Sequence, residues 1–96
     1  MTDDRPPAQS HSAASVAAAE AIRHDTARMR AAVYAHIRAQ GPAGSTDEEG
    51  QDALDMNGNT YRPRRVELHQ RGWIRPAEKH RLTRAGRLAT VWVVAP

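Results

Sequence analysis

The chain of 96 residues contains no cysteine and no phenylalanine, and it has only two tyrosines and two tryptophans. The absence of cysteine excludes disulfides and the thiolate zinc sites that are common in small domains. With so few aromatic residues, a core has to be built largely from Leu, Ile, Val and Ala, and a core of this size gives marginal stability. A dimer or a bound partner would therefore help to stabilise the fold.

Long hydrophobic runs are also missing. No apolar run approaches the ~20 residues that span a bilayer, and the N-terminus lacks the charged-then-apolar order of a secretion signal. We therefore expect a cytoplasmic protein, in the bacterial cytosol or nucleoid. The five histidines show no metal-ligand spacing, and neither a Ser/His/Asp set nor a phosphate-binding loop occurs. The sequence predicts no enzyme, no cofactor, no metal site and no small-molecule ligand.

Positive charge is concentrated in one part of the chain. Residues 61–87 carry nine Lys or Arg and two Glu, a net charge of +7, whereas residues 1–60 carry five basic and nine acidic residues, a net charge of −4. A concentrated basic surface attracts polyanions, and DNA is the commonest polyanion in a cell. Nucleic acid is therefore the first partner to consider, although a run of arginines taken alone is often only a solvated face.

The N-terminal part predicts a tail followed by a helix. Residues 1–11 are polar, contain proline and lack periodicity, so we expect a disordered tail. Residues 12–25 are Ala-rich and favour a helix with Val16, Ala19 and Ile22 along one face. This helix is either a dimerisation element of a homodimer or a cover for the core of its own domain.

A second helix is expected to follow and to open the main domain, residues 26–96. The sequence predicts a break at residues 24–26, where Asp25 or Thr26 can cap a helix that ends at Gln40 before a Gly-Pro pair. An apolar stripe runs along this helix with Tyr34 beside it, and its members are Met29, Val33 and Ile37.

A short acidic helix is predicted next. Thr46 and Glu49 form a capping box, although Ser45 and Glu48 give the same pattern one residue earlier. The helix is expected to end near Met56, and the residues expected to face inward are Gly50, Ala53 and Leu54. Its acids suit the positive end of a helix dipole, and we interpret them as an exposed face that repels DNA. These acids are Asp47, Glu48, Glu49, Asp52 and Asp55.

Residues 57–60 predict a tight turn and then a helix that ends at Arg71, before Gly72. Pro63 would interrupt this helix if its cap were Asn57, but it would fall in the tolerated first turn if the cap were Thr60. We favour the second alternative. Tyr61 is expected to face the core rather than to stack on a base.

Two β-like runs, residues 73–76 and 88–94, end the chain and enclose a basic loop, residues 77–87. Trp73 and Trp92 are expected to pack this hairpin against the helices. The predicted fold class is mainly α with a small β-hairpin (α+β), in the order of a winged helix-turn-helix with an extra N-terminal helix.

Five short motifs occur in a characteristic order and spacing between residues 33 and 94. They are Gly44-x-Thr46-Asp-Glu-Glu49, Leu54-x-Met56, Asn57-x-x-Thr60-Tyr61, Glu67-Leu68-x-x-x-Gly72-x-Ile74, and Arg81-x-Thr83-x-x-Gly86-Arg87 before Val91-Trp92. With these motifs in this order and spacing, the chain resembles winged helix-turn-helix DNA-binding domains of the MarR-like type. It is particularly similar to small winged-helix proteins encoded by phages of GC-rich hosts.

The resemblance implies a recognition helix in the major groove and a basic wing on the DNA backbone or in the minor groove. On the helix it assigns DNA contacts to Asn59, Thr60, Arg62, Arg64 and Arg65, and in the wing to Lys79, Arg81, Arg84 and Arg87. Because relatives of this fold often carry an apolar core residue at the position of Arg65, we expect that side chain to be partly buried. An acid such as Asp52 or Asp55 would pair with it.

The function that follows from this resemblance is sequence-specific binding of double-stranded DNA by a small transcriptional regulator of phage or prophage type. Two alternatives remain open at the level of sequence. One is a winged-helix module that binds another protein, and the other is a non-specific architectural binder of nucleic acid.

Overall fold

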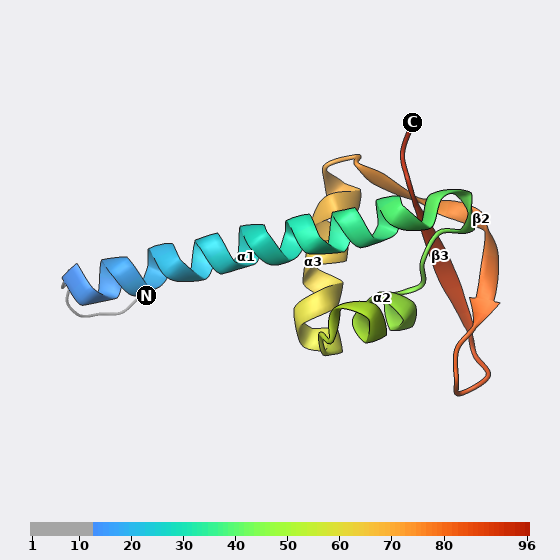
Figure 1. Ribbon diagram of the computed structural model, residues 1–96, viewed down its shortest axis with the longest axis horizontal. Coiled ribbons are helices and arrows are strands. Elements are labelled where there is room, and N and C mark those ends of the chain that lie inside the picture. Colours follow the sequence, from blue (N-terminus) through green and yellow to red (C-terminus); the bar gives the residue numbers. More distant parts are fainter. Residues whose placement is uncertain (1–12) are drawn as a thin grey trace.

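The computed structural model describes residues 13–96, with side chains described from Asp25 onward. The predicted tail, residues 1–11, lies outside this part. The chain is helix-rich and ends in a two-stranded antiparallel hairpin, as the sequence predicted. Its elements are α1 (Ala13–Gln40), a 3-10 turn (Gly41–Ala43), α2 (Asp47–Leu54), α3 (Gly58–Gln70), β2 (Ile74–Leu82) and β3 (Leu88–Val94). The other elements gather around the C-terminal half of α1, and its N-terminal half projects away from them (Figure 1).

The first helix is continuous, so the predicted break at residues 24–26 is wrong. His, Asp and Thr each cost only about 0.5 kcal/mol in a helix interior, and none of them removes a backbone hydrogen bond as proline does. The apolar face predicted at Val16, Ala19 and Ile22 belongs to side chains outside the described part. In the part of the chain that the structure describes, no helix is both long and apolar enough to cross a membrane.

The core lies between α1, α3 and the hairpin. Its buried side chains are Val33, Ile37, Tyr61, Leu68, Ile74 and Trp92. The predicted stripe on α1 is thus confirmed at Val33 and Ile37, which are buried, and Met29 is half-buried. Tyr34 packs at the margin of the core, where its ring meets that of Trp73 edge-on at 5.6 Å. Trp73 nevertheless remains half exposed.

The predicted capping box of α2 is confirmed. The Glu49 amide donates to Thr46 Oγ1 (3.2 Å), and the Thr46 amide donates to Glu49 Oε1 (3.1 Å). Gly50 is buried and Leu54 packs against the core, as predicted, but Ala53 is exposed. The helix is only eight residues long and turns one narrow face towards the core, and that face runs along Gly50 and Leu54.

The third helix begins earlier than we favoured. Asn57 Oδ1 accepts a hydrogen bond from the Thr60 amide (3.0 Å), so Asn57 is the cap and Pro63 lies inside the helix. Pro63 lacks the amide that would bond to the carbonyl of Asn59, one turn earlier. Asn59 is exposed, and water can satisfy that carbonyl. One early proline is therefore compatible with the helix.

α3 ends just before Gly72, as predicted. Gly72 adopts a positive φ of 76° and its amide donates to the His69 carbonyl (3.0 Å), while the Trp73 amide donates to the Leu68 carbonyl (3.0 Å). These two bonds form a Schellman motif, which reverses the chain and leads it into β2.

The hairpin is longer than predicted. β2 continues to Leu82, so the loop contains residues 83–87 instead of 77–87. Residues 77–82 are mostly polar and lack a strand pattern, but pairing with β3 extends the strand through His80, Arg81 and Leu82. The register is irregular between Pro76 and His80. On the other edge of β3, Ser45 and Trp92 exchange backbone hydrogen bonds of 2.9 and 2.8 Å.

A close contact between Tyr61 and Gly50 joins α3 to α2. A Cβ atom at Gly50 would overlap the hydroxyl and ring carbons of Tyr61. Alanine favours a helix over glycine by about 1 kcal/mol, yet we expect Gly50→Ala to lower the free energy of unfolding by about 1–3 kcal/mol because of this overlap. Urea denaturation measures the change. Gln51→Ala on the same helix is the control and is expected to change stability by less than about 0.5 kcal/mol. A stabilised Gly50→Ala variant would contradict the close contact of Tyr61 with Gly50.

Candidate nucleic-acid interface

Carboxylates hold most of the arginines that the resemblance assigns to DNA. The candidates fall into an ion-paired group and an unpaired group among the described residues. The ion-paired group is Arg64, Arg65, Arg81 and Arg84, and the other group is Asn59, Thr60, Arg62, Lys79 and Arg87. The geometry of each pair decides whether the arginine remains available to a ligand.

Arg65 connects α3 to the first turn of α2. Its guanidinium donates to both carboxylate oxygens of Asp47, at 2.9 and 2.6 Å, and lies 4.5 Å from the centre of the Trp92 ring. The side chain is only 17% exposed. The predicted burial and acidic partner are therefore confirmed, but the partner is Asp47 rather than Asp52 or Asp55. A bidentate pair beneath an aromatic ring leaves Arg65 unavailable to DNA.

Arg64 belongs to an ion-pair network on α3 that also reaches α1. It donates to both oxygens of Glu67, at 3.0 and 2.8 Å, and Arg30 of α1 donates to the same carboxylate at 2.9 Å. Burial raises the pKa of Glu67, but the hydrogen bonds from Arg64 and Arg30 outweigh this effect and hold its pKa below the ordinary value. Arg64 is therefore part of an interhelical network, and the structure places it away from the free surface.

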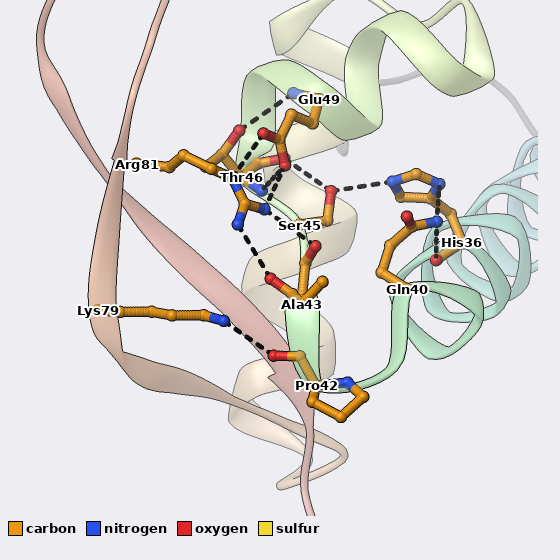
Figure 2. Close-up of polar contacts among 10 residues, drawn as sticks. His36, Gln40, Pro42, Ala43, Ser45, Thr46, Glu49, Lys79 and Arg81 are labelled. Atoms are coloured by element: carbon orange, nitrogen blue, oxygen red, sulfur yellow. Dashed lines mark hydrogen bonds and ion pairs between the residues drawn. The ribbon is translucent and has the colours of Figure 1, made fainter.

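Arg81 fastens the hairpin to the segment that precedes α2 (Figure 2). It donates to both oxygens of Glu49, at 2.8 and 2.7 Å, and to the carbonyls of Ala43 and Gly44, each at 3.1 Å. The hydrogen bond from Arg81 is the main reason that the pKa of Glu49 is lowered. Lys79 donates to the Pro42 carbonyl (3.0 Å). Both cations lie on strand β2, not in the predicted loop, and both contact the body of the domain.

Arg84 is the paired arginine that stays accessible. Its guanidinium contacts Asp52 (2.6 Å), its amide donates to Glu48 (3.0 Å), and its side chain is 71% exposed. The hydrogen bond from Arg84 lowers the pKa of Asp52. Exposed ion pairs contribute little stability because water screens them. A phosphate could therefore replace the carboxylates of α2 at Arg84.

These contacts correct the interpretation of the acidic helix. Four of its acids contact arginines of α3 or the hairpin: Asp47, Glu48, Glu49 and Asp52. They act as internal counterions. The prediction that the acids of α2 form a solvated face that repels DNA is therefore wrong for these four residues.

The remaining candidates lie at two places. Asn59 and Arg62 are exposed near the start of α3, where Thr60 is half-buried, and Arg87 is exposed in the hairpin loop. Neither arginine has a carboxylate partner among the described residues. The start of α3, α2 and the hairpin loop lie along the same side of the molecule, the lower side in Figure 1. The fold thus brings two separate groups of the predicted residues to one side.

Sequence reasoning missed a hollow on another side of the domain. It has a volume of about 630 Å³ and lies between the end of α1 and the hairpin, with Arg38, Arg75 and Glu78 among its lining residues. Both signs of charge occur in it. Arg38 is distant in the chain from Arg75 and Glu78, so only the folded structure brings the three together.

Among the described residues, no group of three or more His, Asp or Glu side chains is placed to hold a metal ion. Comparisons of the chain with models of protein families, with curated proteins and with solved structures found no match. The function has to be argued from the arrangement of the side chains.

We expect the Arg65–Asp47 pair to stabilise the junction of α2 and α3. Arg65→Ala would leave a largely buried carboxylate without its partner and is expected to lower the free energy of unfolding by about 1.5–3 kcal/mol. Arg62→Ala on the exposed face is the control, with an expected change of less than about 0.5 kcal/mol. Chemical denaturation of both single variants and of the Arg65→Ala/Asp47→Ala double variant measures the coupling. Equal losses for Arg65→Ala and Arg62→Ala would contradict the structural role.

A polar network between α1 and the segment before α2 contains His36. Ser45 Oγ donates to the Thr46 carbonyl (3.0 Å), so we assign His36 Nε2 as the donor to Ser45 Oγ (2.9 Å). His36 Nδ1 then faces the amide nitrogen of Gln40 (3.4 Å) as an acceptor. A protonated ring would present a second donor to that amide. Burial lowers the pKa of His36, and the charge of Glu49 offsets this only in part.

This network predicts a pH dependence of stability. Because the pKa of His36 in the folded state is below the ordinary 6.5, the unfolded chain binds a proton first as the pH falls. The free energy of unfolding is expected to fall as the pH is lowered through 6.5, until the folded state also takes up a proton. His36→Gln is expected to flatten this dependence in urea titrations between about pH 7.5 and 5.5. An unchanged slope in the variant would contradict the assignment.

Proposed function

We propose that this chain binds double-stranded DNA as a winged helix-turn-helix protein, with α3 in the major groove and the hairpin loop on the backbone or in the minor groove. The order of elements supports this function, since α2, a three-residue connection and α3 are followed directly by the hairpin. One observation carries the proposal. The start of α3 and the hairpin loop lie on one side of the molecule, the lower side in Figure 1, and each presents an arginine, Arg62 or Arg87, without a carboxylate partner among the described residues.

The start of α3 carries side chains that suit base recognition. Asn59 and Arg62 are exposed, three residues apart and thus on the same side of the helix. An asparagine side chain can pair with the edge of adenine and an arginine with that of guanine, and each bidentate contact contributes about 1–3 kcal/mol of discrimination. Arg64 and Arg65 are assigned to stability in this proposal, because carboxylates of the domain hold them. Base reading is therefore assigned to Asn59 and Arg62.

The hairpin loop suits contact with phosphates. Arg87 is exposed, and Arg84 can exchange its surface carboxylates for phosphate oxygens. Lys79 and Arg81 are engaged along β2 and are left out of the interface. Because few cations remain, we expect a modest salt dependence, with a slope of about −0.9 for each phosphate contact.

We further propose a regulator of phage or prophage type that acts in the bacterial cytosol or nucleoid as a homodimer. The N-terminal half of α1 projects beyond the body of the domain, where it is free to meet a second copy (Figure 1). A dimer of this kind would bind half-sites about 34 Å apart, one turn of the double helix. An inverted repeat in the selected DNA, together with a dimeric mass in solution, would support this arrangement.

The proposed function is tested by titrating the protein with random duplexes at two salt concentrations, followed by sequencing of the retained DNA. A motif is expected to emerge. On that motif, Arg62→Ala is expected to lose about 1–3 kcal/mol of discrimination at one base pair. Arg84→Ala is expected to weaken binding to all sequences equally and to lower the salt slope by about 1. Arg71→Ala, at the opposite end of the same helix, is the matched control and is expected to bind normally.

The other outcomes separate the alternatives. Salt-sensitive binding without an enriched motif would favour an architectural binder, as would equal losses for Arg62→Ala and Arg84→Ala on every sequence. An absence of DNA binding even at low salt would refute the proposed function and favour a module that docks onto another protein.

A further inference from the structure

The two strands of the hairpin carry a pair of exposed leucines where they enter the loop. Leu82 and Leu88 are directly opposite each other in the register, and their exposed fractions are 65% and 72%. Side chains in such a pair contact each other across the strands and form one apolar patch. Nothing in the described part of the chain covers this patch, although leucine is a residue that folded domains usually bury.

The patch faces away from the acids of α2. Arg81 directs its side chain to Glu49 on the body of the domain, and neighbouring residues of a strand point to opposite faces. Leu82 therefore lies on the opposite face of the hairpin, and its partner Leu88 shares that face. The next pair on the same face is polar, His80 with Thr90. The apolar patch is thus separate from the ion pairs that hold the hairpin to α2.

The loop beyond the leucines has a defined shape and a positive charge. The Gly86 amide donates to the Thr83 carbonyl (2.9 Å), the Thr83 amide donates to the Arg87 carbonyl (2.8 Å), and Gly86 adopts a φ of 80°. A tight turn of this kind holds the two leucines in place. Arg87, the neighbour of Leu88, is exposed and has no carboxylate partner among residues 25–96. An apolar pair beside a free cation is complementary to a partner that is anionic and has an apolar surface to offer.

We infer that Leu82 and Leu88 form a wedge that enters the minor groove and kinks the DNA. This inference rests on the proposed function. Proteins that bind the minor groove insert apolar side chains between base pairs, unstack one step and bend the duplex, while arginines contact the flanking phosphates or groove floor. Arg87 and Arg84 are exposed in the loop next to the leucines, and in this proposal Arg87 takes that second role while Arg84 joins it by leaving Asp52 for a phosphate. The stacked bases of DNA offer an apolar surface next to phosphates, so DNA fits both the leucines and the arginines.

The sequence preference of such a wedge follows from the mechanics of DNA. Pyrimidine–purine steps unstack most easily, whereas A-tracts are stiff. We therefore expect the hairpin to lie over a TA or CA step beside the sequence that α3 reads. The preference for a flexible step contributes sequence specificity at base pairs that form no hydrogen bond with the protein.

The test uses the full chain and a duplex of about 30 base pairs with a fluorophore at each end and a flexible TA step near the selected motif. Anisotropy reports binding, and energy transfer between the ends reports bending. The wild-type protein is expected to raise the transfer efficiency. Leu82→Ala/Leu88→Ala is expected to keep its affinity within about tenfold but to lose the rise in transfer. Leu82→Met/Leu88→Met retains apolar volume and is expected to bend the DNA, and thermal unfolding followed by circular dichroism checks that all variants fold.

Each result is decisive for the wedge. Binding by the wild-type protein without a rise in transfer would overturn it, while leaving the proposed function intact. Equal bending by the alanine and wild-type proteins would also overturn it. Leucine-dependent binding to anionic phospholipid vesicles without DNA bending would reassign the patch to a membrane surface. A failure of every variant to bind DNA would refute the proposed function and the wedge together.

Discussion

The contact of Tyr61 with Gly50 sets how closely α3 approaches α2, and most of the other interactions depend on that approach. The tyrosine ring occupies the space that a side chain at Gly50 would need, and burial raises the pKa of its hydroxyl to about 12, so the group stays neutral. At this separation Arg65 reaches Asp47 and lies over Trp92. One small residue in a short helix thus permits an ion pair, a cation–π contact and the junction of the helices with the hairpin.

The arginines have two roles that their positions in the chain do not reveal. Arg30, Arg64 and Arg65 have exposed fractions near one fifth; Arg30 and Arg65 connect helices to one another through carboxylates, and Arg64 shares Glu67 with Arg30. Such pairs are stabilising only while both partners are present, since either charge alone would be costly to bury. Arg84 makes a similar contact at the exposed surface, where replacing the carboxylate by another anion costs little free energy. Burial, not residue type, therefore separates structural from exchangeable charges.

Internal pairing also changes how the basic part of the chain would meet a polyanion. A net charge of +7 over residues 61–87 suggests a broad positive surface, but the acids of α2 neutralise much of it. Of the cations in this segment without a carboxylate partner among the described residues, Arg62 lies at the start of α3 and Arg87 in the hairpin loop. The others, Arg71, Arg75 and Lys79, lie at the end of α3 and on β2. A smaller set of charges attracts DNA less strongly over long range, so in the proposed complex the exact placement of Arg62 and Arg87 and the apolar pair at the hairpin would matter more. Specificity would then depend on shape as well as on charge.

Features that depend on local chemistry could be predicted from the amino-acid sequence. The capping box at Thr46, the end of α3 at Gly72 and the stripe at Val33 and Ile37 all follow from hydrogen bonds or side-chain spacing within a few residues. Tertiary structure decided the rest, because the energies involved come from distant partners. Pairing with β3 turned a polar segment into strand. Arg65 pairs with Asp47, which lies 18 residues away in the chain, and no local sequence pattern predicts a pair at that separation.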